Sequence, residues 1–176
     1  MITLGVITDT HIPQRLKTLP PRVGDVFRGV DSILHAGDIN SRRVLDQLAE
    51  IAPVEAVAGN ADLFRHSLPL TRVVEAEGRR IGLVHGHGGW SKYLRNKVRD
   101  RFGYDEAHYL KIVQQSFGPV EAIVFGHTHR FYRAEQAGIL LFNPGPIAPD
   151  FYNTPGPQVG LLHVSAQAFE VEVIAV

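Results

Sequence analysis

Residues 3–11, TLGVITDTH, guide the prediction of the fold, because a short apolar run ends there in a carboxylate and an imidazole, Asp9 and His11. Short apolar runs bounded by polar residues are typical of buried strands. The same pattern recurs in residues 31–38, DSILHAGD, and in residues 54–60, VEAVAGN. The sequence therefore predicts three buried strands, each followed directly by polar residues.

Two helices are expected between these strands. The first begins near Pro21, and the second follows Ser41, a residue type that often caps helices. The second helix has one apolar face, made of Val44, Leu45, Leu48 and Ile51. An order of strand, helix, strand, helix, strand with right-handed crossovers predicts a parallel sheet.

The second half of the chain is richer in strands. A hairpin is expected over residues 72–84, with its turn near Glu77 and Gly78, and two helices follow at 90–102 and 106–117. Further strands are expected at 120–125, 131–135, 139–143, 159–164 and 168–175. No repeat and no long linker divides the chain, so residues 1–176 are expected to form a single α/β domain.

Composition excludes several classes of protein. The chain has 176 residues, 44% of them hydrophobic, a formal net charge of zero and no cysteine. Disorder, disulfides, thiolate metal sites and cysteine nucleophiles are thereby excluded, and a cytoplasmic, reducing location is expected. Neither a signal peptide nor a membrane span is indicated. A neutral chain also disfavours nucleic acid as the main partner.

The side chains at the expected strand ends are carboxylate, imidazole or amide groups. Such groups suit Mn, Fe, Zn or Ni. In extended backbone, residues i and i+2 point the same way, so the pairs Asp9/His11 and His127/His129 can each aim two ligands at one point. Because parallel strands place their ligands beyond their carboxyl ends, the whole set is expected to converge. It comprises Asp9, His11, Asp38, Asn60, His85, His127 and His129.

Seven ligands are too many for one ion and suit two ions that share a bridging carboxylate. Asp38 lies on the middle one of the three strand ends and is the expected bridge. The alternative is a set of cap and turn residues, since Asp and Asn often follow strands for local hydrogen bonding. Four histidines in this set argue against that alternative.

Four further features each have two interpretations. His87 is either a residue that contacts the substrate or supports a ligand, or a loop histidine, and His35 is expected to be a buried, hydrogen-bonded histidine, with support of a metal ligand as the alternative. Asp62 is expected to stabilise a turn, with an acid–base role as the alternative. The basic segment from Lys92 to Arg101 is either a solvated helix face or a surface that steers an anionic substrate.

The ordered motifs D-x-H, G-D, G-N, H-G-H and G-H-T-H, from Asp9 to His129, resemble those of the calcineurin-like metallophosphoesterase superfamily. Asn143-Pro144-Gly145 and the short length resemble its small prokaryotic YfcE-like phosphodiesterase branch. The resemblance implies a four-layer αββα sandwich with a dimetal site at the carboxyl ends of the strands. It assigns one metal to Asp9, His11, Asp38 and His129, and the other to Asp38, Asn60, His85 and His127.

Two positions depart from the family pattern. Many members carry a histidine after the G-N pair that protonates the leaving group, whereas this chain has Ala61 followed by Asp62. Members of the small branch often carry serine after Asn-Pro-Gly, where this chain has Pro146. The first difference predicts a preference for good leaving groups.

We therefore expect a metal-dependent hydrolase in which a metal-bridging hydroxide attacks a phosphodiester, with phosphomonoesters as second choice. Its catalytic residues would be Asp38, Asn60, His85 and His87, and its cofactors two divalent ions, with Mn favoured over Fe, Ni, Zn or Mg. A small phosphoester is the expected partner, no membrane is involved, and a homo-oligomer is compatible with the sequence. The alternatives are a non-catalytic, metal-binding protein scaffold of the same fold and a nuclease.

Overall fold

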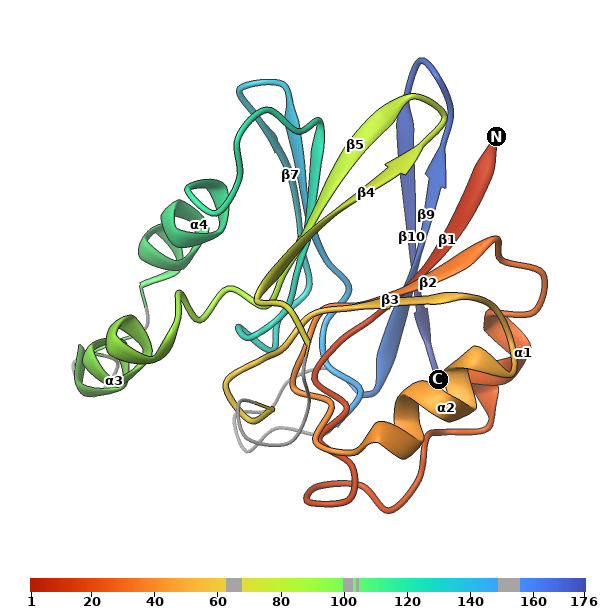
Figure 1. Cartoon of the computed structure of the whole chain (residues 1–176), viewed down its shortest axis with the longest axis horizontal. Helices are drawn as coiled ribbons and strands as arrows, with labels where there is room; N and C mark the ends of the chain where they lie inside the picture. Colours follow the sequence, from red (N-terminus) through yellow and green to blue (C-terminus); the bar gives the residue numbers. More distant parts are fainter. Residues whose placement is uncertain (63–67, 100–102, 104, 149–155) are drawn as a thin grey trace.

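The computed structural model describes residues 1–62, 68–99, 103, 105–148 and 156–176 (Figure 1). Within this part of the chain, ten strands form two five-stranded mixed sheets, and four helices accompany them. The expected end of the helix at 100–102 and most of the loop at 144–156 lie outside the described residues. None of the described helices is long and apolar enough to cross a membrane.

The first sheet has the strand order β10-β9-β1-β2-β3. The expected parallel arrangement of its first three strands is confirmed, because β1 pairs in parallel with β2, and β2 with β3. The remaining two strands add antiparallel pairs on the other side of β1. The five strands are β1 (Ile2–Ile7), β2 (Ser32–His35), β3 (Val54–Ala56), β9 (Gln158–Val164) and β10 (Phe169–Ala175).

The second sheet has the strand order β4-β5-β6-β8-β7. The expected hairpin is present, and its turn residues Glu77 and Gly78 have φ of 53° and 75°. Strands β5, β6 and β8 are parallel, whereas the two edge strands pair antiparallel with their neighbours. The five strands are β4 (Thr71–Ala76), β5 (Arg79–Val84), β6 (Ala122–Phe125), β7 (Tyr132–Gln136) and β8 (Ile139–Asn143).

The helices lie on the outer sides of the two sheets (Figure 1). Helices α1 (Arg22–Val26) and α2 (Arg42–Ala49) lie beside the first sheet, and α3 (Trp90–Arg99) and α4 (Glu106–Gln114) lie beside the second. Ser41 is the N-cap residue of α2 as expected, although its side chain makes no capping hydrogen bond. The expected four layers are thus present.

Three apolar cores hold these layers together. The central core joins the two sheets, with Val6 and Leu34 from the first and Val124 and Phe142 from the second, all fully buried. A second core packs α1 and α2 on the first sheet, and a third packs α4 on the second. Burial on both sides explains why the central strands are almost uniformly apolar. The strands are therefore firmly placed, and so are the loops at their carboxyl ends.

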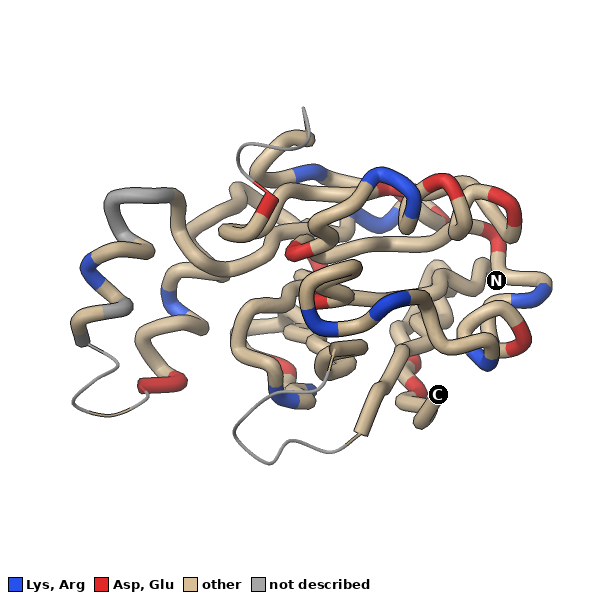
Figure 2. The backbone as a smooth tube through the Cα atoms, turned by 90° about the horizontal axis from the view of Figure 1, so that it is seen from below, with Lys and Arg blue, Asp and Glu red and all other residues tan. Residues whose placement is uncertain are grey.

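Charged residues of both signs are distributed along the backbone, as Figure 2 shows. In the expected basic segment, Arg95 is exposed on α3. The side chains of Lys92, Lys97 and Arg99, and all of Arg101, lie outside what the structure describes. The proposed steering role of this segment therefore stays a prediction.

Candidate metal centre

Polar residues that follow β1, β2, β5 and β6 meet at one edge of the two sheets. The backbone that presents them was predicted wrongly. Asp9 and His11 were expected in extended backbone, yet their φ angles are 52° and 45°, and those of His127 and His129 are 68° and 53°. Left-handed conformations are uncommon outside glycine, although Asp and His are enriched among the exceptions. The two pairs do converge, but through tight left-handed turns.

Strain of this kind costs free energy and is concentrated at functional sites. Asp38 adds a further case with a φ of 55°. Backbone hydrogen bonds hold the turns in place: the Asp9 N–H donates to the Gly37 carbonyl over 3.0 Å, and the His11 N–H donates to the Asp38 carbonyl over 2.9 Å. The loops after β1 and β2 thus support each other directly.

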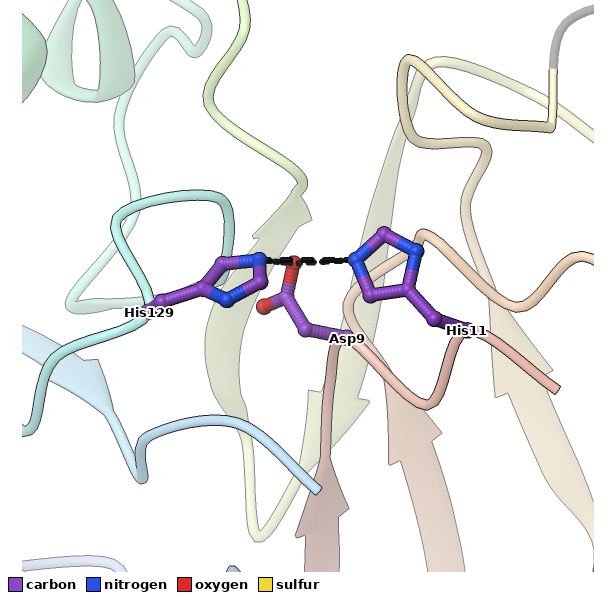
Figure 3. Close-up of side chains that lie close together, drawn as sticks. All are labelled: Asp9, His11 and His129. Carbon is purple, nitrogen blue, oxygen red and sulfur yellow. Dashed lines mark hydrogen bonds and ion pairs between the residues drawn. The ribbon is translucent and has the colours of Figure 1, made fainter. Parts of the chain in front are cut away.

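The first group of converging side chains consists of Asp9, His11 and His129 (Figure 3). Asp9 Oδ1 lies 3.1 Å from His129 Nε2 and 3.9 Å from His11 Nε2. All three residues are buried. One carboxylate oxygen and two imidazole nitrogens therefore point at one small volume and could hold a divalent metal ion.

The second group consists of Asp9, Asp38 and His85. His85 Nε2 lies 3.4 Å from Asp38 Oδ1 and 4.0 Å from Asp9 Oδ1. Asn60 joins this group, because its Oδ1 lies 3.2 Å from His85 Nε2 and its amide donates to Asp38 Oδ2 over 3.3 Å. The two groups share Asp9, and Asp38 also reaches the first group, with Oδ2 lying 3.4 Å from His11 Nε2.

His127 lies beside the second group rather than inside either triad of ligand atoms. Its ring centroid is 5.1 Å from that of His85, and its backbone N–H donates to Asp9 Oδ2 over 3.2 Å. The structure therefore gathers all seven side chains that the sequence singled out. Their roles as metal ligands stay a prediction.

The residues fit a cation on two observations. Asp9 is fully buried, and imidazole nitrogens approach its Oδ1 atom, that of His129 to 3.1 Å and that of His11 to 3.9 Å. A buried carboxylate surrounded by imidazoles is costly to bury unless a proton or a cation completes it. The donor set of carboxylates, imidazoles and one amide is also the set that divalent transition metals prefer.

The electrostatics of the cluster agree with this fit. Burial alone would raise the pKa of the Asp38 carboxyl, but the charge and hydrogen bond of His85 outweigh burial and lower that pKa to about 2. Burial would likewise lower the pKa of His85, but Asp38 and Asp9 raise it to about 9. The carboxylates thus stay ionised and draw positive charge into a buried site.

Two imidazoles beside His85, those of His127 and His87, have lowered pKa values and stay neutral near pH 7, and the neutral form is the one that binds metals. Burial lowers the pKa of His127 to about 3 and that of His87 to about 4. His87 is buried, and its ring centroid lies 5.6 Å from that of His85. Both of its ring nitrogens lack a hydrogen-bond partner among the described residues. The interpretation of His87 as a residue available to a ligand is therefore favoured over that of an ordinary loop histidine.

Asp62 has the turn-stabilising role that the sequence predicted. Its fully buried carboxylate accepts hydrogen bonds from the backbone N–H groups of Ile39, Asn40 and Gly59 at 2.7–3.1 Å. These bonds tie the loop after β2 to the loop after β3. They hold Asp38 and Asn60 at a fixed separation.

Two supporting residues were not recognised as such from the sequence. The Thr8 hydroxyl donates to Asp9 Oδ2 over 2.8 Å and so orients that carboxylate. The buried Asn143 amide donates to the Gly126 carbonyl and to Thr128 Oγ1, both at 3.1 Å, and holds the loop that carries His127. The role of Thr8 could have been inferred from its position directly before Asp9. The role of Asn143 could not, because it depends on contacts between loops that are distant in the sequence.

The histidines outside the cluster have local partners where the structure describes them. His35 is fully buried, with Nε2 3.2 Å from Thr10 Oγ1 and Nδ1 accepting from the Gly37 N–H, as expected for a structural histidine. His108 contacts Asn96 on α3, and His163 contacts Thr3 and Glu172. His66 lies outside the described residues.

The chain matches known proteins over almost its whole length. Residues 2–167 match the calcineurin-like phosphoesterase superfamily domain. The chain belongs to this superfamily. It is 36% identical over 174 residues to a probable metallophosphoesterase of Methanothermobacter thermautotrophicus, covering 97% of this chain and 91% of that protein. It is 35% identical over 147 residues to a probable metallophosphoesterase of Methanocaldococcus jannaschii, covering 83% of this chain and 69% of that protein.

Solved structures show the same fold. Vps29 of Entamoeba histolytica, in a structure with zinc, aligns with a TM-score of 0.74 at 23% identity and covers 98% of both chains. Vps29 of Chaetomium thermophilum aligns with a TM-score of 0.73 at 23% identity and covers 99% of this chain and 97% of that chain. These likenesses confirm the predicted αββα architecture of the superfamily.

Proposed function

We propose that the chain is a metal-dependent hydrolase of phosphodiesters, with phosphomonoesters as the second choice of substrate. The observation that carries this proposal is the pair of ligand triads that share Asp9. Two adjoining sets of ligands suit two ions that clamp one phosphoryl group. Family membership supports the phosphoester part of the proposal, since the curated relatives are named probable metallophosphoesterases.

In this proposal, Asp9, His11, Asp38 and His129 would hold one ion, and Asp38, Asn60, His85 and His127 would hold the other. Bound divalent ions would polarise the phosphoryl oxygens and lower the pKa of a water molecule, so that a hydroxide nucleophile exists near neutral pH. Manganese is our first choice among Mn, Fe, Ni, Zn and Mg. Asp38 would bridge, because its Oδ2 faces His11 and its Oδ1 faces His85.

The protein's own side chains would orient the substrate. Asn60 and His85 are joined through Asn60 Oδ1 and His85 Nε2, and His85 Nδ1 lies 2.8 Å from the Ala36 carbonyl. This chain of contacts fixes the imidazole ring in one orientation. His87 lies beyond His85 and would contact the oxygens of the phosphoryl group or of the ester.

Good leaving groups would be favoured, because Ala61 stands where many superfamily members carry a proton-donating histidine. The Ala61 N–H donates to Asp38 Oδ1 over 2.7 Å, so this position adjoins the site directly. The backbone N–H of Ala61 can hold the loop against Asp38, but its methyl side chain cannot donate a proton to a leaving group. Aryl phosphodiesters would therefore be hydrolysed faster than alkyl ones.

The test is a hydrolysis panel on metal-stripped protein, with each of the five divalent ions added back separately. The panel contains bis(4-nitrophenyl) phosphate, 4-nitrophenyl phosphate, cyclic nucleotides and a single-stranded oligonucleotide. We expect metal-dependent turnover that is fastest with the aryl diester. Fastest cleavage of the oligonucleotide would favour the nuclease alternative. Two bound metals without turnover of any substrate would favour a scaffold of the same fold.

A further inference from the structure

An apolar pocket of about 250 Å³ lies next to His87. Its walls come from three parts of the chain: the start of β4, the end of β5 with the loop that follows it, and the end of α4 with the two residues after it. Leu70, Val84 and Ile112 supply its apolar surface, and Gln115 and Ser116 supply polar groups. His87 is the only ionisable side chain among the lining residues that the structure describes.

Two lining residues, Val84 and His87, connect the pocket to the candidate metal centre. Val84 lines the pocket and directly precedes His85, a member of the second ligand group. His87 lines the pocket too, and its ring lies 5.6 Å from the ring of His85 and 6.3 Å from that of His127, measured between centroids. A ligand held at the cluster could therefore extend past His87 into the pocket.

One wall of the pocket is bare backbone. Gly88 and Gly89 follow His87 with φ of 75° and 83°, a conformation that disfavours other residues. A Cβ built on Gly89 would meet nothing within 4 Å, so glycine is needed there for backbone conformation and not to avoid a clash. The turn leaves open space where side chains would otherwise stand.

His87 itself lacks a partner within the described protein. The residue is 3% exposed, and neither ring nitrogen, Nδ1 or Nε2, has a hydrogen-bond partner among the described residues. Buried polar groups in native proteins nearly always have partners, and exceptions call for an explanation such as a ligand. An acceptor atom at the mouth of the pocket would supply the missing partner.

We propose that this pocket is the subsite for one uncharged, mainly apolar ester substituent of the substrate. His87 would donate a hydrogen bond to the ester oxygen that joins this substituent to phosphorus, at the mouth of the pocket. The inference rests on the proposed phosphoesterase function and adds the substrate class. Pockets that hold whole drug-sized ligands measure roughly 300–1,000 Å³. The smaller volume here suits one aryl or branched alkyl group of a phosphoester, and the lack of charged lining residues among those described disfavours an ionised one.

The test compares two inhibitors that share a phosphoryl group and differ in the substituent, phenylphosphonate and methylphosphonate. Their dissociation constants are measured by calorimetry on the Mn²⁺-loaded protein. Burial of a phenyl ring predicts that phenylphosphonate binds about tenfold more tightly. The Ile112 methyl resonances should shift with phenylphosphonate and stay unchanged with methylphosphonate.

Ser116→Phe fills the pocket from the turn after α4 and should bring the two dissociation constants within about twofold of each other, while methylphosphonate binding stays unchanged. Thr71→Phe fills it from β4 and serves as a second variant should the first fail to fold. Ser116→Ala controls for the lost hydroxyl, which donates to the Ile112 carbonyl over 2.8 Å. Lys111→Phe places the same ring on an exposed position of α4 outside the pocket lining.

The role of His87 is tested with substrates and inhibitors together. His87→Leu should lower kcat/KM for an aryl ester at least tenfold, and His87→Gln, which keeps a donor, should restore part of it. Phenylphosphonate has no ester oxygen, so its binding should stay within about threefold of wild type in both variants. An equal loss in both variants, or a loss of phenylphosphonate binding as well, would overturn the hydrogen bond.

The outcomes separate the two proposals. Equal affinities for both phosphonates in the wild-type protein, or a phenyl preference that survives both filling variants, would overturn the subsite and leave the phosphoesterase function standing. Failure of both phosphonates to bind the Mn²⁺-loaded protein would overturn the proposed function, and the subsite with it.

Discussion

His11, from the first sheet, and His129, from the second, face each other where the loops of the two sheets meet. Their Nε2 atoms are 3.4 Å apart and their ring centroids 5.4 Å apart (Figure 3). The loops after β1 and β6 bring them together. Asp9 Oδ1 lies within 4 Å of both nitrogens. Three electron-rich atoms in so small a volume repel one another unless a proton or a cation lies among them. A divalent cation held there, as we propose, would relieve this repulsion.

Asp38→Asn should remove both metals and nearly all turnover. Asp38 directs one carboxylate oxygen at each half of the cluster, and an amide cannot supply two anionic oxygens. Elemental analysis after desalting gives the metal content per chain. Asp46→Asn, an exposed carboxylate on α2, is the matched control and should keep two metals. Two metals per chain in Asp38→Asn would show that the bridge is elsewhere, with Asp9 the first alternative.

Gly59→Ala should weaken metal binding at least tenfold without removing a ligand. A Cβ at Gly59 would collide with Asp38 Oδ1 and lie 2.8 Å from Asp38 Cγ, so the carboxylate must move. Gly118→Ala adds the same methyl group where nothing lies within 4 Å and should leave affinity unchanged. Titration of metal-stripped protein by calorimetry compares the two. Equal affinities would mean that the cluster tolerates displacement of Asp38.

Asp62→Asn should destabilise the fold by about 2–4 kcal/mol, because the new amide would turn a donor toward backbone N–H groups that now have a buried acceptor. Urea unfolding in the presence of a chelator measures the free energy of unfolding without a contribution from metal binding. Asp46→Asn again serves as control, since surface ion pairs contribute about 0–1 kcal/mol. A loss below about 1 kcal/mol in Asp62→Asn would contradict a structural role.

The rate of hydrolysis should depend steeply on the pKa of the leaving group. With Ala61 in place of the family's proton donor, the departing oxygen would receive no proton and at most a hydrogen bond from His87, so it would carry most of the negative charge that develops. A series of substituted phenyl esters measures the slope, and Ala61→His should make it shallower. A flat series in the wild-type protein would reveal another proton donor, and His87 would be the first residue to examine.

Much of this architecture could be predicted from local sequence. The strands before Asp9, Asp38 and Asn60 are rich in apolar residues, because helices cover the outer faces of the sheets and the central core covers the inner ones, and such runs are easy to recognise. The hairpin around Glu77 and Gly78 follows from turn chemistry. Because strand order and crossover hand are restricted, the convergence of the polar residues at one edge also followed.

The backbone of the site could not be predicted in this way. The convergence of Asp9 with His11 was expected from extended backbone, but both residues adopt left-handed φ. Nothing in D-T-H or H-T-H specifies that conformation locally, since the turns are held by distant groups such as the Gly37 carbonyl. The pocket beside His87 was missed for the same reason, because its walls come from separate elements whose packing only the folded chain reveals.

The most direct test of the account is a titration of metal-stripped protein with Mn²⁺, in which turnover of bis(4-nitrophenyl) phosphate and bound metal are measured on the same samples. A dimetal hydrolase should show no turnover without metal, a rise in turnover as ions bind, and a plateau at two ions per chain. The Asp38→Asn variant should stay inactive throughout. A protein that binds no divalent ion, or that turns over the diester equally well after treatment with a chelator, would contradict it.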